Sequence, residues 1–212
     1  MIISKLYIKN FRGYKEQTIY LHDDLNVIIG KNDVGKSTIL EALEIFFNND
    51  LVKIDVSDLS KKRDQESDTD ITIQVSFQVA QGKSYTIDTV PTYLASEYLL
   101  DSDKYLTIRK VWSASAQTIT TKSLKTFIVA DYPNAKFPTP LVSKKITELR
   151  KDLAIFDNSH DTSLVNKAKS SAIRQAIYTF SNVQSIDLIE TFIPIDAEDG
   201  KSTDFVNTIL KT

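Results

Sequence analysis

The chain has 212 residues, of which 42% are hydrophobic and 25% charged, with a net charge of −2. This composition is ordinary for a soluble globular protein of one large domain, or one domain with an insertion. The absence of cysteine excludes disulfides, thiolate metal sites and cysteine nucleophiles. The N-terminus lacks a signal-peptide core, and no run approaches the roughly 18 apolar residues of a membrane span. We therefore expect a cytoplasmic protein with no membrane partner.

The first fifty residues have the clearest pattern. Ile2–Ile8 alternates apolar and polar residues, Gly13 is a turn signal, and Gln17–Leu21 continues as a second strand, which predicts a β-hairpin. Residues 25–30 are a short apolar, β-branched run that ends in glycine, the pattern of a strand buried on both faces. From Lys36 onward, strong helix formers predict an amphipathic helix. Its apolar stripe comprises Ile39, Leu40, Leu43, Phe46 and Phe47.

The rest of the chain alternates between strand-like and helix-like patterns. The charged residues 53–70 predict a surface loop or short helix, and Ile71–Val79 alternates strictly, as a strand does. Further strands are predicted over 83–90, 104–112, 118–129 and 186–195, and helices over 141–155 and 164–180. This order predicts an α/β fold in four parts. These are a hairpin with a P-loop strand and helix (1–50), a β-rich lobe (51–130), a helical insertion (131–183) and a strand returning to the core (184–212).

Charge is unevenly distributed. Residues 104–151 hold 10 basic and 2 acidic side chains, a local net charge of +8. Such a segment can be a footprint for a phosphate backbone, or a solvated face that acidic neighbours balance. The sequence leaves both interpretations open.

Two of the chain's five glycines occur in Gly30-x-x-x-x-Gly35-Lys36-Ser37, which matches the P-loop pattern between a predicted strand and a predicted helix. The glycines allow backbone N–H groups to converge on a phosphate, and the helix directs its positive end at the same anion. Lys36 supplies a cation for the β- and γ-phosphates, and the Ser37 hydroxyl is suited to Mg²⁺. We therefore expect ATP and Mg²⁺ as ligands.

Other nucleotide-binding classes fit less well. The nearest string to a GTPase base-reading motif is "NKAK" (Asn166–Lys169), which lacks the aspartate, and no lid-like arginine cluster indicates a small-molecule kinase. A second string, "EDGKST" (Glu198–Thr203), has Ile195 where a P-loop needs its first glycine, and is expected to be a loop.

The segments "LYIKNFRGY" (Leu6–Tyr14) and "GKNDVGKST" followed by "ILEAL" resemble the SMC/RecF-type branch of ABC ATPases. Asp33 in "NDVGKS" looks more like the OLD (overcoming lysogenization defect) family and related anti-phage ATPases. The resemblance is specific over residues 2–47 and loose over 48–130. It implies that Arg12 approaches the nucleotide, that Asn32 faces the γ-phosphate, and that the remaining loop residues hold phosphates and Mg²⁺. The residues so implicated are Arg12, Gly30, Asn32, Asp33, Gly35, Lys36, Ser37 and Thr38.

The same resemblance implies an ATPase head that sandwiches ATP in a dimer, acts on DNA and can be coupled to a nuclease. The chain departs from that pattern because it contains no ABC signature motif. "SIDLIE" (Ser185–Glu190) is a poor Walker B strand, and no carboxylate cluster resembles a Toprim nuclease site. The two histidines, His22 and His160, fall in expected surface turns. We therefore expect the N-terminal lobe of a longer ATPase, with an incomplete core and little activity alone. The alternative is a non-hydrolysing nucleotide sensor or scaffold that recruits an effector.

Overall fold

The computed structural model describes residues 2–29, 35–47, 51–80, 82–87 and 90–195. The chain forms two compact units, Met1–Gln78 with Thr107–Phe127, and Val79–Leu106 with Ile128–Thr212. These boundaries differ from the four predicted segments, because the chain leaves the first unit after residue 78, returns to it at residue 107 and leaves it again after residue 127.

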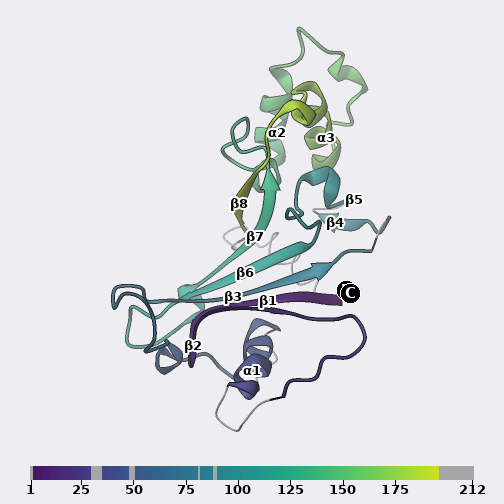
Figure 1. The fold of residues 1–212 in the computed structure, drawn as a ribbon. Coiled ribbons are helices and arrows are strands. Elements are labelled where there is room, and N and C mark those ends of the chain that lie inside the picture. Colours follow the sequence, from purple (N-terminus) through teal and green to yellow (C-terminus); the bar gives the residue numbers. More distant parts are fainter. Residues whose placement is uncertain (1, 30–34, 48–50, 81, 88–89, 196–212) are drawn as a thin grey trace. The chain divides into compact units, whose positions relative to one another are not determined.

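The main sheet has six strands in the hydrogen-bonded order β2-β1-β3-β6-β7-β8 (Figure 1). Strand β1 lies antiparallel to both β2 and β3. The mixed α/β class is confirmed, and the strands predicted from alternation are found close to their expected positions. The bounds are Ile2–Phe11 for β1, Tyr14–Tyr20 for β2, Asp70–Gln78 for β3, Leu106–Ser113 for β6, Leu124–Tyr132 for β7 and Ile189–Pro194 for β8.

The core of the first unit lies between this sheet and helix α1 (Lys36–Phe47). Alternation along the strands places apolar side chains on one face of β1 and β3, and nearly all of them are fully buried. The helix contributes a matching apolar face, and the Phe46 and Phe77 rings lie 6.2 Å apart. The buried side chains of these three elements include Leu6, Ile8, Phe11, Ile39, Ala42, Ile45, Phe46, Ile71, Ile73, Val75 and Phe77.

The buried face of α1 differs from the predicted apolar stripe at several positions, and Leu43 and Phe47 are only partly buried. Leu40 is 58% exposed, whereas Ala42 and Ile45 are buried. The buried face is therefore rotated toward Ala42 and Ile45. An i, i+3/i+4 pattern defines a stripe only to within about one residue when apolar side chains flank it on both sides.

The prediction of a buried strand over residues 25–30 is wrong for its described part, 25–29, which forms no strand. Leu25, Val27 and Ile29 are 74%, 67% and 89% exposed. A strand needs neighbours that accept and donate its backbone hydrogen bonds. The side of β1 away from β3 is already occupied by β2, and no ladder among the described residues includes 25–29.

The second unit contains a short hairpin, β4 (Tyr85–Ile87) with β5 (Val90–Thr92), and two helices that pack on each other. Helix α2 spans Ile146–Ala154 and α3 spans Ser170–Phe180. Both begin later than predicted, and each is preceded by a separate 3₁₀ turn, η4 (Leu141–Ser143) and η5 (Thr162–Leu164). The other 3₁₀ turns of the chain are η1 (Val56–Asp58), η2 (Ala95–Glu97), η3 (Thr121–Ser123) and η6 (Val183–Ser185).

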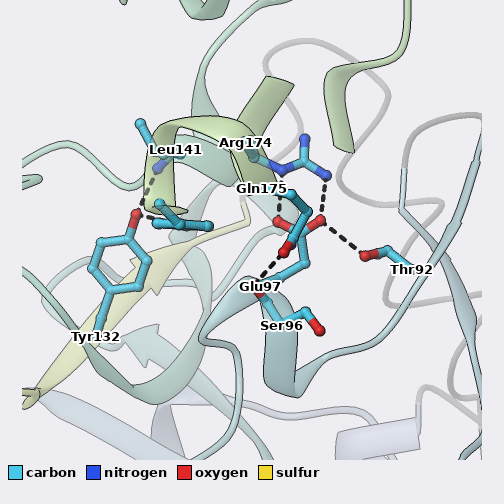
Figure 2. A network of polar contacts seen from close by, with 8 residues as sticks. Thr92, Ser96, Glu97, Tyr132, Leu141, Arg174 and Gln175 are labelled. Atoms are coloured by element: carbon cyan, nitrogen blue, oxygen red, sulfur yellow. Dashed lines mark hydrogen bonds and ion pairs between the residues drawn. The ribbon is translucent and has the colours of Figure 1, made fainter. Parts of the chain in front are cut away.

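A buried ion pair joins η2 to α3 inside this unit (Figure 2). The side chains of Glu97 and Arg174 are both fully buried. Arg174 donates from Nε to Glu97 Oε2 at 2.7 Å and from a terminal nitrogen to Oε1 at 3.1 Å. The Thr92 hydroxyl donates to Oε1 at 3.0 Å. The two-point geometry and the added hydroxyl offset the cost of removing both charges from water.

A tyrosine pair lies in the same core. The Tyr132 and Tyr178 hydroxyl oxygens are 3.0 Å apart, and the Leu141 N–H donates to Tyr132 Oη at 2.8 Å. Burial raises the pKa of both phenols, so they stay neutral and available as hydrogen-bond partners.

No helix in the described part of the chain has both the length and the apolar character needed to cross a bilayer.

Candidate functional site

The predicted phosphate-loop residues divide into two groups. Gly30, Asn32 and Asp33 lie outside the described residues. Gly35, Lys36, Ser37 and Thr38 are described, and the last three form the first turn of α1. The described part of the candidate site is therefore the C-terminal half of the phosphate loop and the first turn of α1.

Gly35 leads into α1 with a backbone φ of +88°, a left-handed conformation in which a side chain is strained. Its carbonyl oxygen accepts the Ile39 N–H at 3.3 Å, as the first hydrogen bond of the helix. The same oxygen accepts the Tyr14 hydroxyl at 3.2 Å. The second glycine of the motif thus has the conformation that the sequence pattern requires.

The first turn of α1 is suited to an anion. It contains no acidic side chain, so the turn itself adds no negative charge at the positive end of the helix. Ser37 is exposed, and Lys36 and Thr38 are partly exposed. These residue types fit a nucleotide, because backbone N–H groups and a lysine favour phosphate oxygens, while a serine hydroxyl and water favour Mg²⁺.

Arg12 lies beside this helix, and acids bind two nitrogens of its guanidinium. Its Nε donates to Asp58 Oδ1 at 2.8 Å, and a terminal nitrogen forms an ion pair with Glu41 of α1. The Arg12 backbone N–H also donates to the Asp58 carbonyl oxygen at 2.6 Å. Arg12 therefore connects the hairpin turn to α1 and η1 in this structure, and its contact with a nucleotide stays a prediction.

Asp58 is itself held in place, which makes the Arg12 contact a defined one. The side chain is buried, and Oδ2 accepts the Asp55 N–H at 2.8 Å. Asp55 in turn accepts the Ser57 N–H, completing a capping box around η1. An acid in such a box points in a fixed direction, so its remaining oxygen can fix Arg12.

The C-terminal end of α1 also has a charged partner that the sequence did not reveal. Lys110 on β6 is buried, and its ammonium donates to the Phe46 carbonyl oxygen at 2.7 Å. A cation at this position complements the negative end of the helix. Burial lowers the pKa of Lys110 to about 8.

Sequence reasoning missed Tyr14, Glu41, Asp58 and Lys110. Tyr14 and Glu41 fall within the two segments that carry the family resemblance, but nothing local pairs them with Gly35 or Arg12. Lys110 was counted in the basic segment 104–151, and its burial removes it from any surface footprint. A contact between residues 21 to 64 positions apart leaves no periodic signal.

The histidines and the acids of the candidate Walker B strand are not arranged as a catalytic group in the described structure. His22 and His160 are exposed in turns, and His160 stacks on Phe180 with ring centroids 4.4 Å apart. Strand β8 begins at Ile189, so Asp187 precedes it and Glu190 is exposed on it. Residues 198–203 lie outside the described chain. Among the described residues, no three histidine, aspartate or glutamate side chains are grouped closely enough to hold a metal.

Residues 1–211 match the protein family described as AAA ATPase domain. The chain belongs to this family. An AAA ATPase domain binds ATP, so the match agrees with the phosphate-loop chemistry of Gly35, Lys36 and Ser37. Because it covers nearly the whole chain, the second unit is also part of the AAA ATPase domain rather than an unrelated appendage.

Curated relatives of this AAA ATPase domain include two classes of DNA repair protein. A DNA replication and repair protein RecF of Acetivibrio thermocellus is 32% identical over 101 residues, 43% of this chain and 27% of that protein. The RecF of Chlamydia caviae is 49% identical over 45 residues, 21% of this chain and 12% of that protein. The DNA double-strand break repair Rad50 ATPase of Archaeoglobus fulgidus is 36% identical over 69 residues, 28% of this chain and 8% of that protein.

The AAA ATPase domain thus spans at most about a quarter of the length of these relatives. A solved structure from a study of ATP-driven dimerization and DNA-stimulated activation of SMC ATPases aligns with a TM-score of 0.41. The alignment has 15% sequence identity and covers 60% of this chain and 69% of that one. By sequence, the chain is therefore similar to parts of the RecF and Rad50 proteins.

Proposed function

We propose that the chain is the ATP-binding N-terminal lobe of an SMC/RecF-like ATPase of the OLD type, acting on DNA in anti-phage defence. The observation that carries the ATP-binding part is the left-handed Gly35 leading into an α1 first turn without acids. It occurs in a chain that matches the AAA ATPase domain family over residues 1–211. Asp33 of the "NDVGKS" string supports the OLD assignment by resemblance.

In the proposed site, each described residue has a distinct task. The N-terminal N–H groups of α1 and the Lys36 ammonium hold phosphate oxygens, and the Ser37 hydroxyl is a ligand for Mg²⁺. Thr38 adds a second hydroxyl in the same turn. Mg²⁺, when bound, neutralises charge that develops on the phosphates.

ATP binding is tested by titrating the chain with a fluorescent ATP analogue in the presence of Mg²⁺. We expect Lys36→Ala to weaken binding by at least tenfold, and Ser37→Ala to abolish the gain in affinity that Mg²⁺ gives. Lys125→Ala is the matched control, because Lys125 is an exposed lysine of the same unit on β7. Equal affinities for Lys36→Ala and the wild type would refute the proposed site.

We further propose that hydrolysis requires a second region, with a Walker B strand and signature motif, and ATP-dependent dimerisation. The exposed apolar residues at 25–29 support this proposal, because a run of this composition is expected to pair inside a sheet. A non-hydrolysing sensor that recruits a nuclease or other effector is the alternative. It is favoured by the absence of a metal-binding acidic group among the described residues. A longer protein that carries the second region and binds ATP without turnover would favour the sensor over the ATPase.

DNA binding is proposed for the assembled ATPase, since the RecF and Rad50 relatives are DNA repair proteins by name. The basic segment offers Lys144, Lys145 and Arg150 for phosphate contacts. These residues already make local contacts: Lys144 with Asp152 at 2.7 Å, the Lys145 N–H with Glu148 Oε2 at 2.8 Å, and Arg150 Nε with the Lys167 carbonyl oxygen at 2.8 Å. Reversing all three charges should reduce the salt dependence of DNA affinity. If the dependence of DNA affinity on salt concentration were unchanged, these three residues would not be part of the DNA-binding surface.

A further inference from the structure

The hydroxyl of Tyr14 rests on the last glycine of the phosphate loop. Tyr14 begins strand β2, and its Oη donates to the Gly35 carbonyl oxygen at 3.2 Å. The ring end is packed so closely that a Cβ on Gly35 would lie 2.9 Å from Oη and 3.1 Å from Cζ. This contact joins residues 21 positions apart and belongs to the first unit alone.

The contact between Tyr14 and Gly35 fixes the orientation of a single peptide group. The Gly35 carbonyl and the Lys36 N–H belong to the same planar peptide and point in opposite directions. Two donors, Tyr14 Oη and the Ile39 N–H, hold the carbonyl. They therefore also set the direction of the Lys36 N–H, which lies at the N-terminal end of α1 where anions bind.

The turn that precedes Tyr14 is held in place by contacts of Phe11 and Arg12. Phe11, directly before the turn, is fully buried, pairs with Tyr14 in the β1–β2 register and bridges to Leu59. Arg12 is bonded to Asp58 and Glu41. A turn held on both sides can hold Tyr14 in place.

We propose that Tyr14 is a positioning residue for the phosphate loop, whose hydroxyl orients the Gly35–Lys36 peptide toward the nucleotide phosphates. This inference rests on the proposed ATP-binding function and assigns Tyr14 no contact with the nucleotide. It predicts that loss of the hydroxyl alone, with the ring retained, weakens phosphate binding while leaving the fold intact.

The experiment uses Tyr14→Phe, with Tyr20→Phe as the matched control in the same strand, because Tyr20 is 70% exposed. Three quantities are measured: amide hydrogen exchange of residues 36–40 without nucleotide, affinity for a fluorescent ATP analogue with Mg²⁺, and the thermal unfolding midpoint. A net hydrogen bond of about 1 kcal/mol corresponds to roughly fivefold. We expect about fivefold faster exchange and about fivefold weaker affinity for Tyr14→Phe, with an unfolding midpoint lowered by only about 2–4 °C and no effect of Tyr20→Phe.

The outcomes separate this inference from the proposed function. Unchanged exchange and affinity in Tyr14→Phe would overturn the positioning role. So would a lower unfolding midpoint with unchanged affinity, because the hydroxyl would then serve only stability. A wild-type chain that binds no ATP contradicts the proposed function. In that case, the exchange of residues 36–40 still decides whether Tyr14 orients the Gly35 peptide.

Discussion

Gly35 shows how much of the candidate site depends on a single backbone angle. Its φ of +88° turns the chain from the loop into α1, and the space where a Cβ would stand is occupied by the end of the Tyr14 ring. Both constraints select glycine, the first through backbone strain and the second through contact. The P-loop pattern predicted the glycine, but only the structure reveals the second reason for it.

We expect Gly35→Ala to weaken binding of the fluorescent ATP analogue by roughly tenfold and to destabilise the first unit. A left-handed L-residue costs about 1–2 kcal/mol, and the new Cβ also displaces the tyrosine ring. The measurements are nucleotide titration and urea unfolding. Gly13→Ala is the control, since Gly13 has open space around its Cβ position and no left-handed φ. Equal effects of the two substitutions would contradict this account.

The buried pair Glu97–Arg174 gives a residue-scale prediction for stability. Arg174→Met should lower the free energy of unfolding by about 3–5 kcal/mol, because it leaves a buried carboxylate without its cation. Breaking the partly exposed pair Lys144–Asp152 with Lys144→Met should cost less than about 1 kcal/mol. Urea unfolding measures both.

A second variant checks the cause. Glu97→Leu with Arg174→Met removes both charges, and should recover much of the stability lost in Arg174→Met alone. If the single substitution cost no more than Lys144→Met, the buried pair would not be the support of the second unit that its geometry suggests.

At the scale of elements, helix α1 is held at both ends, by Tyr14 at Gly35 and by Lys110 at Phe46. The second contact gives the stability of the protein a pH dependence. Burial lowers the pKa of Lys110 from 10.5 to about 8. Between these values the unfolded chain binds more protons than the folded chain, so this group makes the folded state more stable as pH rises.

We therefore expect the wild type to gain about 2 kcal/mol relative to Lys110→Met between pH 7 and pH 9.5. At pH 7 the buried ammonium lowers the stability of the wild type, and its deprotonation removes that cost. Urea unfolding of both proteins at the two pH values measures the gain. Lys125→Met, at an exposed position of β7, is the matched control. A difference that stayed constant with pH would show that Lys110 is not buried as a cation.

Elements with strict alternation were predictable because one face of each strand is buried and the other is not. The strand over 70–78 and helix α1 are found where the periodicity places them. Residues 25–29 are the opposite case: their composition indicates burial, but burial requires partner strands that a local pattern cannot supply. The same limit explains the site, where the motif predicted Gly35 to Thr38 but not the tyrosine that contacts Gly35 or the acids that hold Arg12.

For the molecule as a whole, the match over residues 1–211 places the first and second units in one ATPase domain family. ATP binding and ATP hydrolysis need different groups, since phosphate positioning alone does not orient a water or stabilise the developing charge. The proposed site accounts for the positioning groups, and this separation leads to a prediction for the whole molecule.

We expect the chain by itself to bind ATP but to release phosphate no faster than the buffer does. Phosphate release is measured with the wild type and with Lys36→Ala, which reports any turnover that depends on the site. Turnover by the wild type that Lys36→Ala abolishes would show that the chain is a complete ATPase. If the chain alone shows no turnover, adding a polypeptide that carries a Walker B strand and a signature motif is expected to give hydrolysis under the proposal of a second region.

The exposed run at 25–29 also has a consequence for how the chain behaves at high concentration. Leu-Asn-Val-Ile-Ile combines high β propensity with no charge and no proline, which is the composition that stacks edge to edge into intermolecular β structure. Asp23 and Asp24 directly precede it, and their repulsion between copies opposes that stacking. Colloidal stability of the isolated chain should therefore depend on these two aspartates, and should fall when both are replaced by asparagine.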